Sequence, residues 1–225
     1  MTPNFWRALR RFWERDLGLS IVLALVLLIV FVLPPLVAPP LGERTPVIDL
    51  AFSLLLLAGV AGLRTRAAVR ALLLALAMAA LVVRWWPSAT EAARALSGLA
   101  SLALMAMVVL VQAFRGGAVN LHRIQGAVAA YLLLGLAWAY AYELVAALNP
   151  GAFASGQSLV EQSRVWIYYS FVTLTTVGYG DVTPVHPAAR SLAMLEALTG
   201  QLYPAILLAR LVSLHPQGPV ESEAK

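Results

Sequence analysis

The chain has 225 residues, of which 61% are hydrophobic and only 12% are charged. About a quarter of the residues in a soluble domain are charged, so this composition excludes an ordinary soluble protein and predicts an integral membrane protein. The sequence contains no cysteine, which excludes disulfides and thiolate metal sites. The net charge of +5 comes largely from arginine, and in a membrane protein such an excess sets topology rather than binding nucleic acid.

Six apolar segments are long enough, or nearly so, to cross a hydrocarbon core that needs about 20 helical residues. We expect these spanning helices at 17–37, 47–63, 67–86, 92–114, 121–148 and 188–214. Between the last two, the turn Asn149-Pro150-Gly151 is followed by the segment 161–174, which favours a helix. This helix is too short to span the bilayer, so we expect it to enter the membrane and return.

The placement of arginine orients these helices. An inside N-terminus leaves the following residues in the cytoplasm: Arg7, Arg10, Arg11, Arg15, Arg64, Arg66, Arg70, Arg115, Arg123 and Arg210. The outer loops then hold Arg44, Arg84, Arg94, Arg164 and Arg190, and acidic residues offset them. This bias obeys the positive-inside rule and predicts that both termini lie in the cytoplasm.

The most specific motif follows the short helix and reads Thr175-Thr176-Val177-Gly178-Tyr179-Gly180-Asp181. Gly178 and Gly180 lack a Cβ and tolerate positive φ angles, which lets successive peptide carbonyls point at one axis. A row of such carbonyls can replace the water shell of a K⁺ ion. A phosphate loop is also rich in glycine, but it needs a Lys-Ser/Thr pair after the glycines, and none follows here.

This motif resembles the selectivity filter of the tetrameric potassium channels, and the layout of 121–214 is similar to their pore domain. The resemblance implies an all-α integral membrane protein of prokaryotic type, with six transmembrane helices and a re-entrant pore helix and filter loop between helices five and six. It implies a filter of Thr175, Thr176, Val177, Gly178, Tyr179 and Gly180, with K⁺ held at Thr176, Val177, Gly178 and Tyr179. One filter per chain implies a homotetramer around one pore, with no cofactor other than K⁺ in the filter.

The resemblance also implies an outer mouth, in which Asp181 ends the filter and Trp166, Tyr168 and Tyr169 form an aromatic cuff. The family commonly has two adjacent tryptophans where this chain has the two tyrosines, and Tyr168 can donate its hydroxyl to Asp181. Val172 stands where some potassium channels have a buried glutamate, so we do not expect their carboxyl–carboxylate coupling. An ordinary solvated carboxylate is the alternative for Asp181.

In the last helix, Gly200 lies where the family often has a hinge glycine, and Pro204 follows one turn later. A moving gate and a fixed kink both remain open, since Gly and Pro are frequent in membrane helices. Gln201, Pro204 and Leu208 share one helical stripe and would line the inner vestibule. Glu196 lies off this stripe, where a hydrogen-bonded structural role and an ion site are both open.

The first four helices, within residues 1–116, resemble a voltage-sensor domain without gating charges. The fourth helix has no charged residue between Leu96 and Leu110, whereas voltage sensors carry Arg or Lys at every third position. We therefore do not expect steep voltage gating. The pore domain then covers 117–215, and 216–225 form a short cytoplasmic tail.

Together these features predict a potassium-selective channel that conducts K⁺ passively in a bacterial inner membrane, in contact with lipid and with no nucleic acid. The alternative is a non-conducting or regulatory membrane subunit on the same scaffold. An enzyme is a distant third, because the sequence shows no paired carboxylates, metal-ligand spacing or nucleophile–base constellation in its helices.

Overall fold

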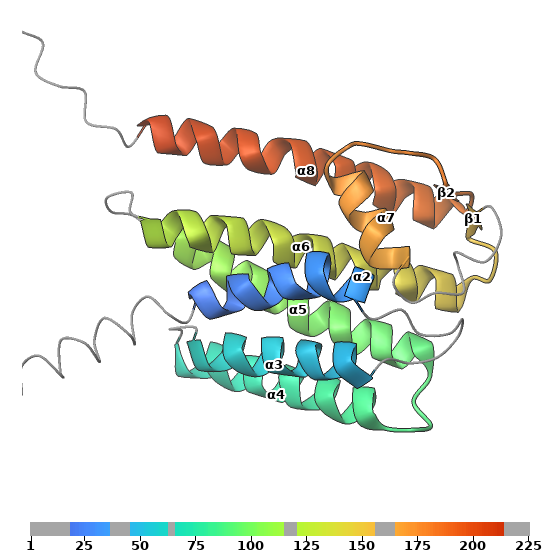
Figure 1. Ribbon diagram of the computed structural model, residues 1–225, viewed down its shortest axis with the longest axis horizontal. Helices are drawn as coiled ribbons and strands as arrows, with labels where there is room; N and C mark the ends of the chain where they lie inside the picture. Colours follow the sequence, from blue (N-terminus) through green and yellow to red (C-terminus); the bar gives the residue numbers. More distant parts are fainter. Residues whose placement is uncertain (1–18, 37–45, 63–65, 115–120, 156–164, 214–225) are drawn as a thin grey trace, which may run out of the picture.

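The computed structural model describes residues 19–36, 46–62, 66–114, 121–155 and 165–213. Within these ranges the long helices run roughly side by side in one bundle, and a short helix crosses it at an angle (Figure 1). Five of the helices are long and apolar enough to cross a membrane: Leu19–Leu36, Ala67–Trp85, Glu91–Phe114, Arg123–Leu148 and Pro187–Arg210. The chain is therefore an integral membrane protein.

The helices lie close to the segments that the sequence predicts. The first, Leu19–Leu36, contains the π-helical turn η1 (Leu28–Val32) and α2 (Leu33–Leu36). It is followed by α3 (Pro46–Gly62), α4 (Ala67–Trp85), α5 (Glu91–Phe114), α6 (Leu121–Leu148), α7 (Val165–Leu174) and α8 (Pro187–Ser213). Because α3 has only 17 residues, a sixth crossing of the membrane stays a prediction.

The π-helical turn in the first helix has a local cause. The backbone N–H of Leu33 bonds to the carbonyl of Leu28, five residues earlier, where an α-helix would use four. Pro34 and Pro35 follow directly, and a proline ring has no N–H and crowds the carbonyl four residues before it. Widening the helix by one residue accommodates both prolines, so the helix continues to Leu36.

Two short strands were not predicted from the sequence. Strand β1 (Phe153–Ser155) pairs antiparallel with β2 (Val182–Pro184), and Ala154 lies opposite Thr183. The all-α prediction is wrong in this detail, because three residues are too few to show the alternating pattern of a strand. The pairing of these strands joins the segment after α6 to the segment directly after the glycine-rich motif.

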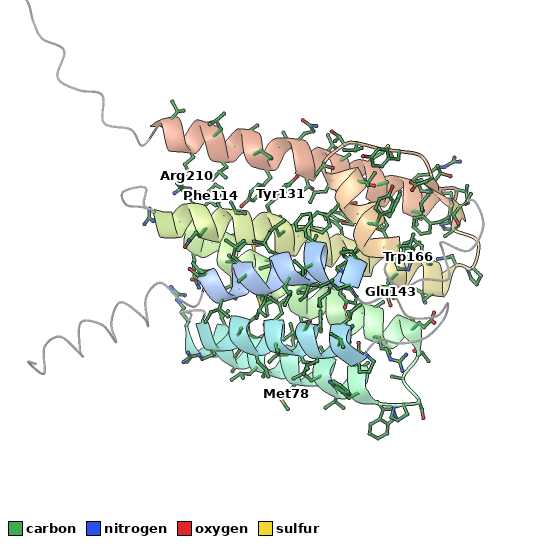
Figure 2. The ribbon with its side chains drawn as sticks, viewed as in Figure 1. Met78, Phe114, Tyr131, Glu143, Trp166 and Arg210 are labelled. Atoms are coloured by element: carbon green, nitrogen blue, oxygen red, sulfur yellow. The ribbon has the colours of Figure 1, made fainter. Side chains whose placement is uncertain are left out.

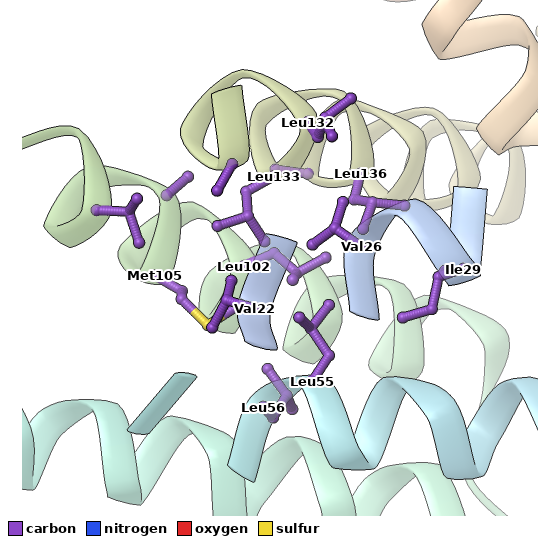
Figure 3. Packing of buried hydrophobic residues seen from close by; sticks show 14 of the residues in the cluster. Val22, Val26, Ile29, Leu55, Leu56, Leu102, Met105, Leu132, Leu133 and Leu136 are labelled. Atoms are coloured by element: carbon purple, nitrogen blue, oxygen red, sulfur yellow. The ribbon is translucent and has the colours of Figure 1, made fainter. Parts of the chain in front are cut away.

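The main core lies where the first helix, α3, α5 and α6 meet (Figure 3). Its fully buried members include Val22 and Val26 of the first helix, Leu55 of α3, Leu102 of α5 and Leu133 of α6. Large apolar side chains elsewhere point outward, as Met78 of α4 does in Figure 2. Apolar side chains on both the inside and the outside are what a bundle surrounded by lipid requires.

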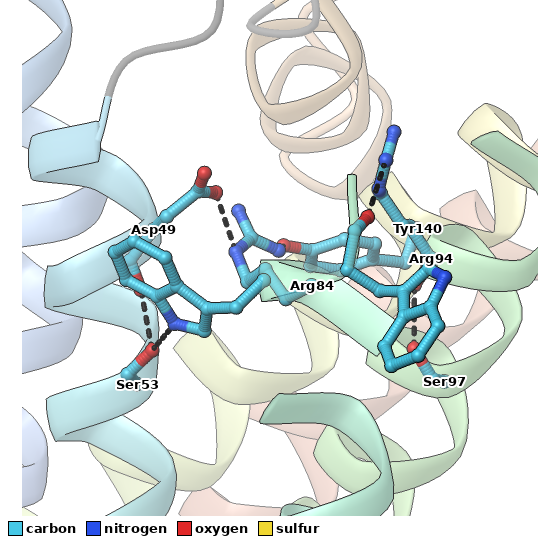
Figure 4. Close-up of polar contacts among 8 residues, drawn as sticks. Asp49, Ser53, Arg84, Arg94, Ser97 and Tyr140 are labelled. Carbon is cyan, nitrogen blue, oxygen red and sulfur yellow. Dashed lines mark hydrogen bonds and ion pairs between the residues drawn. The ribbon is translucent and has the colours of Figure 1, made fainter. Parts of the chain in front are cut away.

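The structure corrects the predicted position of one arginine. Arg84 was assigned to an outer loop, although the helix predicted at 67–86 contains it. The structure places it in the last turn of α4, and its guanidinium turns into the bundle (Figure 4). Its Nε lies 2.6 Å from Asp49 Oδ1, and Nη1 donates to the Tyr140 hydroxyl at 2.8 Å. Its Cζ also lies 4.4 Å from the centre of the Phe52 ring, close enough for a cation–π contact. One side chain thus joins α3, α4 and α6.

Replacing Arg84 should destabilise the bundle. Arg84→Met keeps most of the chain length but leaves Asp49 largely buried without its partner, which costs roughly 3 kcal/mol. Thermal unfolding of the purified protein in detergent should show a lower midpoint, and adding Asp49→Asn should recover most of the loss. Arg70→Met, an exposed change on the same helix, should have no effect. An equal loss from both arginine variants would contradict this account.

Candidate functional site

The glycine-rich motif lies between α7 and β2, and α7 determines where it begins. One side of α7 is buried through Val165, Trp166, Tyr169, Ser170 and Leu174. This spacing of one and three or four residues forms one helical face, which packs against α6 and α8. The helix ends at Leu174, so its C-terminal carbonyls and their partial negative charge lie at the start of the motif.

The backbone N–H groups of the motif turn back toward α7. Thr175 donates to the carbonyl of Phe171 at 3.0 Å, and Thr176 donates to that of Thr173 at 2.9 Å. Val177 and Gly178 both donate to the carbonyl of Val172, at 2.9 and 3.3 Å. Within the described ranges, no backbone N–H bonds to the carbonyls of 176–180. The amides are therefore satisfied inside the chain, and these carbonyls are left for another partner.

The φ angles of the motif alternate in sign. Thr176, Gly178 and Gly180 have φ of 60°, 59° and 79°, whereas Val177 and Tyr179 between them do not have positive φ. Such alternation turns every second peptide over, so successive carbonyls can face one side. The positive φ expected for the two glycines is confirmed.

The positive φ of Thr176 was not foreseen from the sequence. A β-branched residue in this region is strained by about 1–3 kcal/mol, so its surroundings must hold it there. The side chain of Gln201 does so from α8, because its Nε2 donates to Thr176 Oγ1 at 2.9 Å. Gln201 is therefore connected to the motif itself.

The predicted bond at the outer end of the motif is confirmed. The Tyr168 hydroxyl donates to Asp181 Oδ2 at 2.7 Å, and Asp181 Oδ1 accepts the backbone N–H of Val182 at 3.0 Å. The Tyr168 ring also stacks on that of Tyr179, with centres 6.5 Å apart and planes at 2°. The bond to Asp181 raises the pKa of Tyr168 to about 12, so the hydroxyl remains a donor at physiological pH.

The other two aromatic residues of the expected cuff face elsewhere. Tyr169 and Trp166 are buried, with their rings 4.7 Å from Tyr142 and 4.8 Å from Phe153 respectively. Neighbouring residues on a helix are about 100° apart, so Tyr168 and Tyr169 cannot both face Asp181. Among the described residues of this chain, Tyr168 is the one of the three that is hydrogen-bonded to Asp181, and a cuff that includes Trp166 and Tyr169 stays a prediction. The aromatic cluster that holds α7 from behind, with Tyr142 and Phe153, was missed.

The structure gives Gly200 a role in packing. A Cβ built on Gly200 would lie 1.8 Å from the carbonyl oxygen of Leu174, so the backbone of α8 touches the end of α7 here. Helix α8 is continuous through Gly200 and Pro204. Gln201, Pro204 and Leu208, the predicted vestibule residues, are all exposed along α8. Their lining of a vestibule stays a prediction, as does any hinge at Gly200.

Adding a methyl group at Gly200 should force α7 and α8 apart. Gly200→Ala places its Cβ on a backbone oxygen that cannot rotate away, and overpacking of this kind costs typically about 1–3 kcal/mol or more. Thermal unfolding in detergent should show a clear fall in midpoint. Gly126→Ala is the matched control, because its Cβ would meet only side-chain atoms, the end of Leu19 at 3.3 Å and the Ala113 Cβ at 3.6 Å. Equal midpoints for the two variants would contradict the close approach.

The bond between Tyr168 and Asp181 should appear as an energetic coupling. Tyr168→Phe and Asp181→Asn should each lower the free energy of unfolding by roughly 1 kcal/mol, and the double variant should lose no more than either. Chemical unfolding of the three variants measures this cycle. Tyr179→Phe keeps the stacked ring and should change little. Additive losses would mean that the two side chains do not act together.

Residues 129–215 match the family model described as an ion channel. The chain is 38% identical over 84 residues to "Two pore potassium channel c" of Oryza sativa subsp. japonica, which is 37% of this chain and 17% of that protein. It is 33% identical over 87 residues to "Protein LctB" of Bacillus caldotenax, 36% of this chain and 64% of that protein. It is 43% identical over 65 residues to "Protein LctB" of Geobacillus stearothermophilus, which is 28% of this chain and 46% of that protein.

The chain thus covers less than two thirds of the length of each of these relatives. No solved structure matches the chain significantly.

Proposed function

We propose that the protein is a potassium-selective channel, because residues 129–215 match a family model described as an ion channel and the chain is similar over 84 residues to a two pore potassium channel. Ions pass down their electrochemical gradient, and no reaction is catalysed. Thr176, Val177, Gly178 and Tyr179 provide the carbonyls that hold K⁺, and Thr175 and Gly180 complete the filter. The observation that carries the proposal is the row of backbone carbonyls between α7 and β2.

That row has the properties that a dehydrated K⁺ requires. The amides from Thr175 to Gly178 are occupied by α7, the φ angles alternate, and the carbonyls from 176 to 180 have no backbone donor among the described residues. Irregular backbone with free carbonyls is costly at membrane depth unless it faces a water-filled path or other protein. A row of carbonyls around a narrow pore, in contact with K⁺, meets that condition.

One chain supplies only one wall of such a pore, so we propose a homotetramer. Two side chains of the filter support this, because Val177 is 51% exposed and Tyr179 is 71% exposed in the single chain. The pore-side half of the molecule is also poorly covered: Leu195, Leu198 and Leu202 of α8 are each more than half exposed. Neighbouring copies and lipid would cover these residues.

The remaining parts of the proposal concern the surroundings of the filter. Asp181, held by Tyr168, forms the outer mouth, while Gly200, Gln201, Pro204 and Leu208 belong to the inner helix that surrounds the cavity. We place the protein in a bacterial inner membrane with both termini in the cytoplasm, as the arginine bias favours. Helix α5 carries Glu91 and Arg94 only in its first turn, so steep voltage gating is not part of the proposal.

Purified protein in liposomes should pass K⁺ and exclude Na⁺, with Ba²⁺ as a blocker. Gly178→Ala should abolish K⁺ flux, because an alanine at φ 59° is strained and would disturb the carbonyl row. Gly151→Ala is the matched control: Gly151 also has positive φ, at 85°, and also has open space around its Cβ position, but it lies outside the filter. It should retain flux.

The outcomes separate the alternatives. Equal permeation of Na⁺ would contradict selectivity for K⁺. Absence of flux from a correctly folded, tetrameric protein would favour the non-conducting or regulatory subunit. Loss of flux in both glycine variants would mean that backbone strain anywhere in this region disables the protein, and the filter would lose its specific support.

A further inference from the structure

A cluster of polar side chains lies behind the filter, buried among three helices. Glu196 of α8 is completely inaccessible to solvent, as are Ser170 of α7 and Tyr142 of α6. Glu196 Oε1 lies 2.5 Å from Ser170 Oγ, and Glu196 Oε2 is hydrogen-bonded to the Tyr142 hydroxyl. Ser170 Oγ also lies 2.7 Å from the backbone carbonyl of Gly135 in α6. These three contacts connect α6, α7 and α8.

The number of hydrogens in this cluster determines the state of the carboxyl group. Each of the three contacts needs one hydrogen. The hydroxyls of Ser170 and Tyr142 supply two, and the carbonyl of Gly135 can only accept. If Glu196 is ionised, Ser170 can donate its hydrogen to the carboxylate or to the Gly135 carbonyl, and the other of these two short contacts then has no hydrogen between its oxygens. A protonated carboxyl supplies the third hydrogen: Glu196 donates to Ser170, Ser170 donates to Gly135, and Tyr142 donates to Glu196.

The surroundings of Glu196 also favour the neutral acid. An ionised carboxylate at membrane depth is costly unless a cation accompanies it. Within the described ranges, Glu196 forms no ion pair. The titratable groups that interact electrostatically with it, among the described residues, are tyrosines, namely Tyr142 and Tyr131 of α6 and Tyr169 of α7. None of these brings a positive charge.

The contact between Glu196 and Ser170 is the second between α7 and α8, after that of Gly200 with Leu174. Ser170 lies one helical turn before Leu174 on α7, and Glu196 lies one turn before Gly200 on α8. Gly200 touches the Leu174 carbonyl, and Glu196 bonds to Ser170, so two successive turns of α7 are held by two successive turns of α8. The contact between Gly200 and Leu174 lies directly before the filter begins at Thr175.

We propose that Glu196 is a neutral carboxylic acid which donates a hydrogen bond to Ser170 and thereby positions α7 behind the filter. It is a positioning residue, because it reaches the conducting path only through α7. The neutral state of the Glu196 carboxyl does not depend on the proposed channel function. The effect of Glu196 on K⁺ flux rests on that proposed function.

Infrared spectroscopy of the purified full chain tests the protonation state directly. At neutral pH an ordinary carboxyl is ionised, whereas a protonated one shows a separate C=O stretching band. Wild type should show this band, and Glu196→Gln should lose it. Glu91→Gln, an exposed change at the start of α5, should keep it. Absence of the band from wild type, or its survival in Glu196→Gln, would overturn the assignment whether or not the protein conducts.

The positioning role is tested by two substitutions in liposomes. Glutamine preserves all three contacts: its amide N–H donates to Ser170, its amide oxygen accepts from Tyr142, and Ser170 still donates to Gly135. K⁺ flux through Glu196→Gln should therefore stay within about twofold of wild type. Glu196→Ala leaves Ser170 and Tyr142 without their partner and should lose roughly tenfold or more of the flux. A tenfold loss in Glu196→Gln would instead show that a negative charge is required. Full flux in Glu196→Ala would show that the cluster does not position α7.

Discussion

The contact between the C-terminal turn of α7 and the middle of α8 is the constraint on which the filter region depends. Leu174 is the last residue of α7, and its carbonyl touches α8 at Gly200, where no side chain intervenes. The amides of the following four residues donate to carbonyls of α7, so the position of this helix constrains the backbone of the glycine-rich motif. Apolar packing alone would leave this polar backbone without partners, which a membrane does not tolerate.

Two clusters of polar side chains link helices from different parts of the chain. Arg84 joins α3 and α4 to Tyr140 of α6, and Glu196 joins α7 and α8 to Tyr142 of α6. Between helices in lipid, apolar contacts are weakly specific because the lipid tails are equally apolar. A buried hydrogen bond allows only one register, since any shift leaves a polar atom without a partner. Helix α6 takes part in both clusters and so connects α3 and α4 to α7 and α8.

The C-terminal part of α8 is also connected to α5. Arg210 donates from Nη2 to the carbonyl of Phe114, the last residue of α5, and its guanidinium lies 5.0 Å from the centre of the Phe114 ring (Figure 2). A cation is favourable at the C-terminus of a helix, where the last carbonyls lack intrahelical partners. Tyr203 adds an edge contact to the same ring, with centres 6.3 Å apart. The C-terminal end of α5 thus touches the C-terminal part of α8.

The sequence by itself determined the positions of the helices and of the glycine-rich motif between α7 and β2. Long apolar runs require helices in a membrane, and two glycines in a short motif indicate where positive φ angles occur, so both features can be read from local residues. Tertiary structure decided which side of each helix faces which neighbour. It turned Arg84 inward, directed Tyr168 but not Tyr169 toward Asp181, held Thr176 through Gln201, and brought Glu196 to Ser170 and Tyr142. These pairs lie far apart in the sequence or depend on helix rotation, and in an almost uniformly apolar chain the hydrophobic pattern does not specify that rotation.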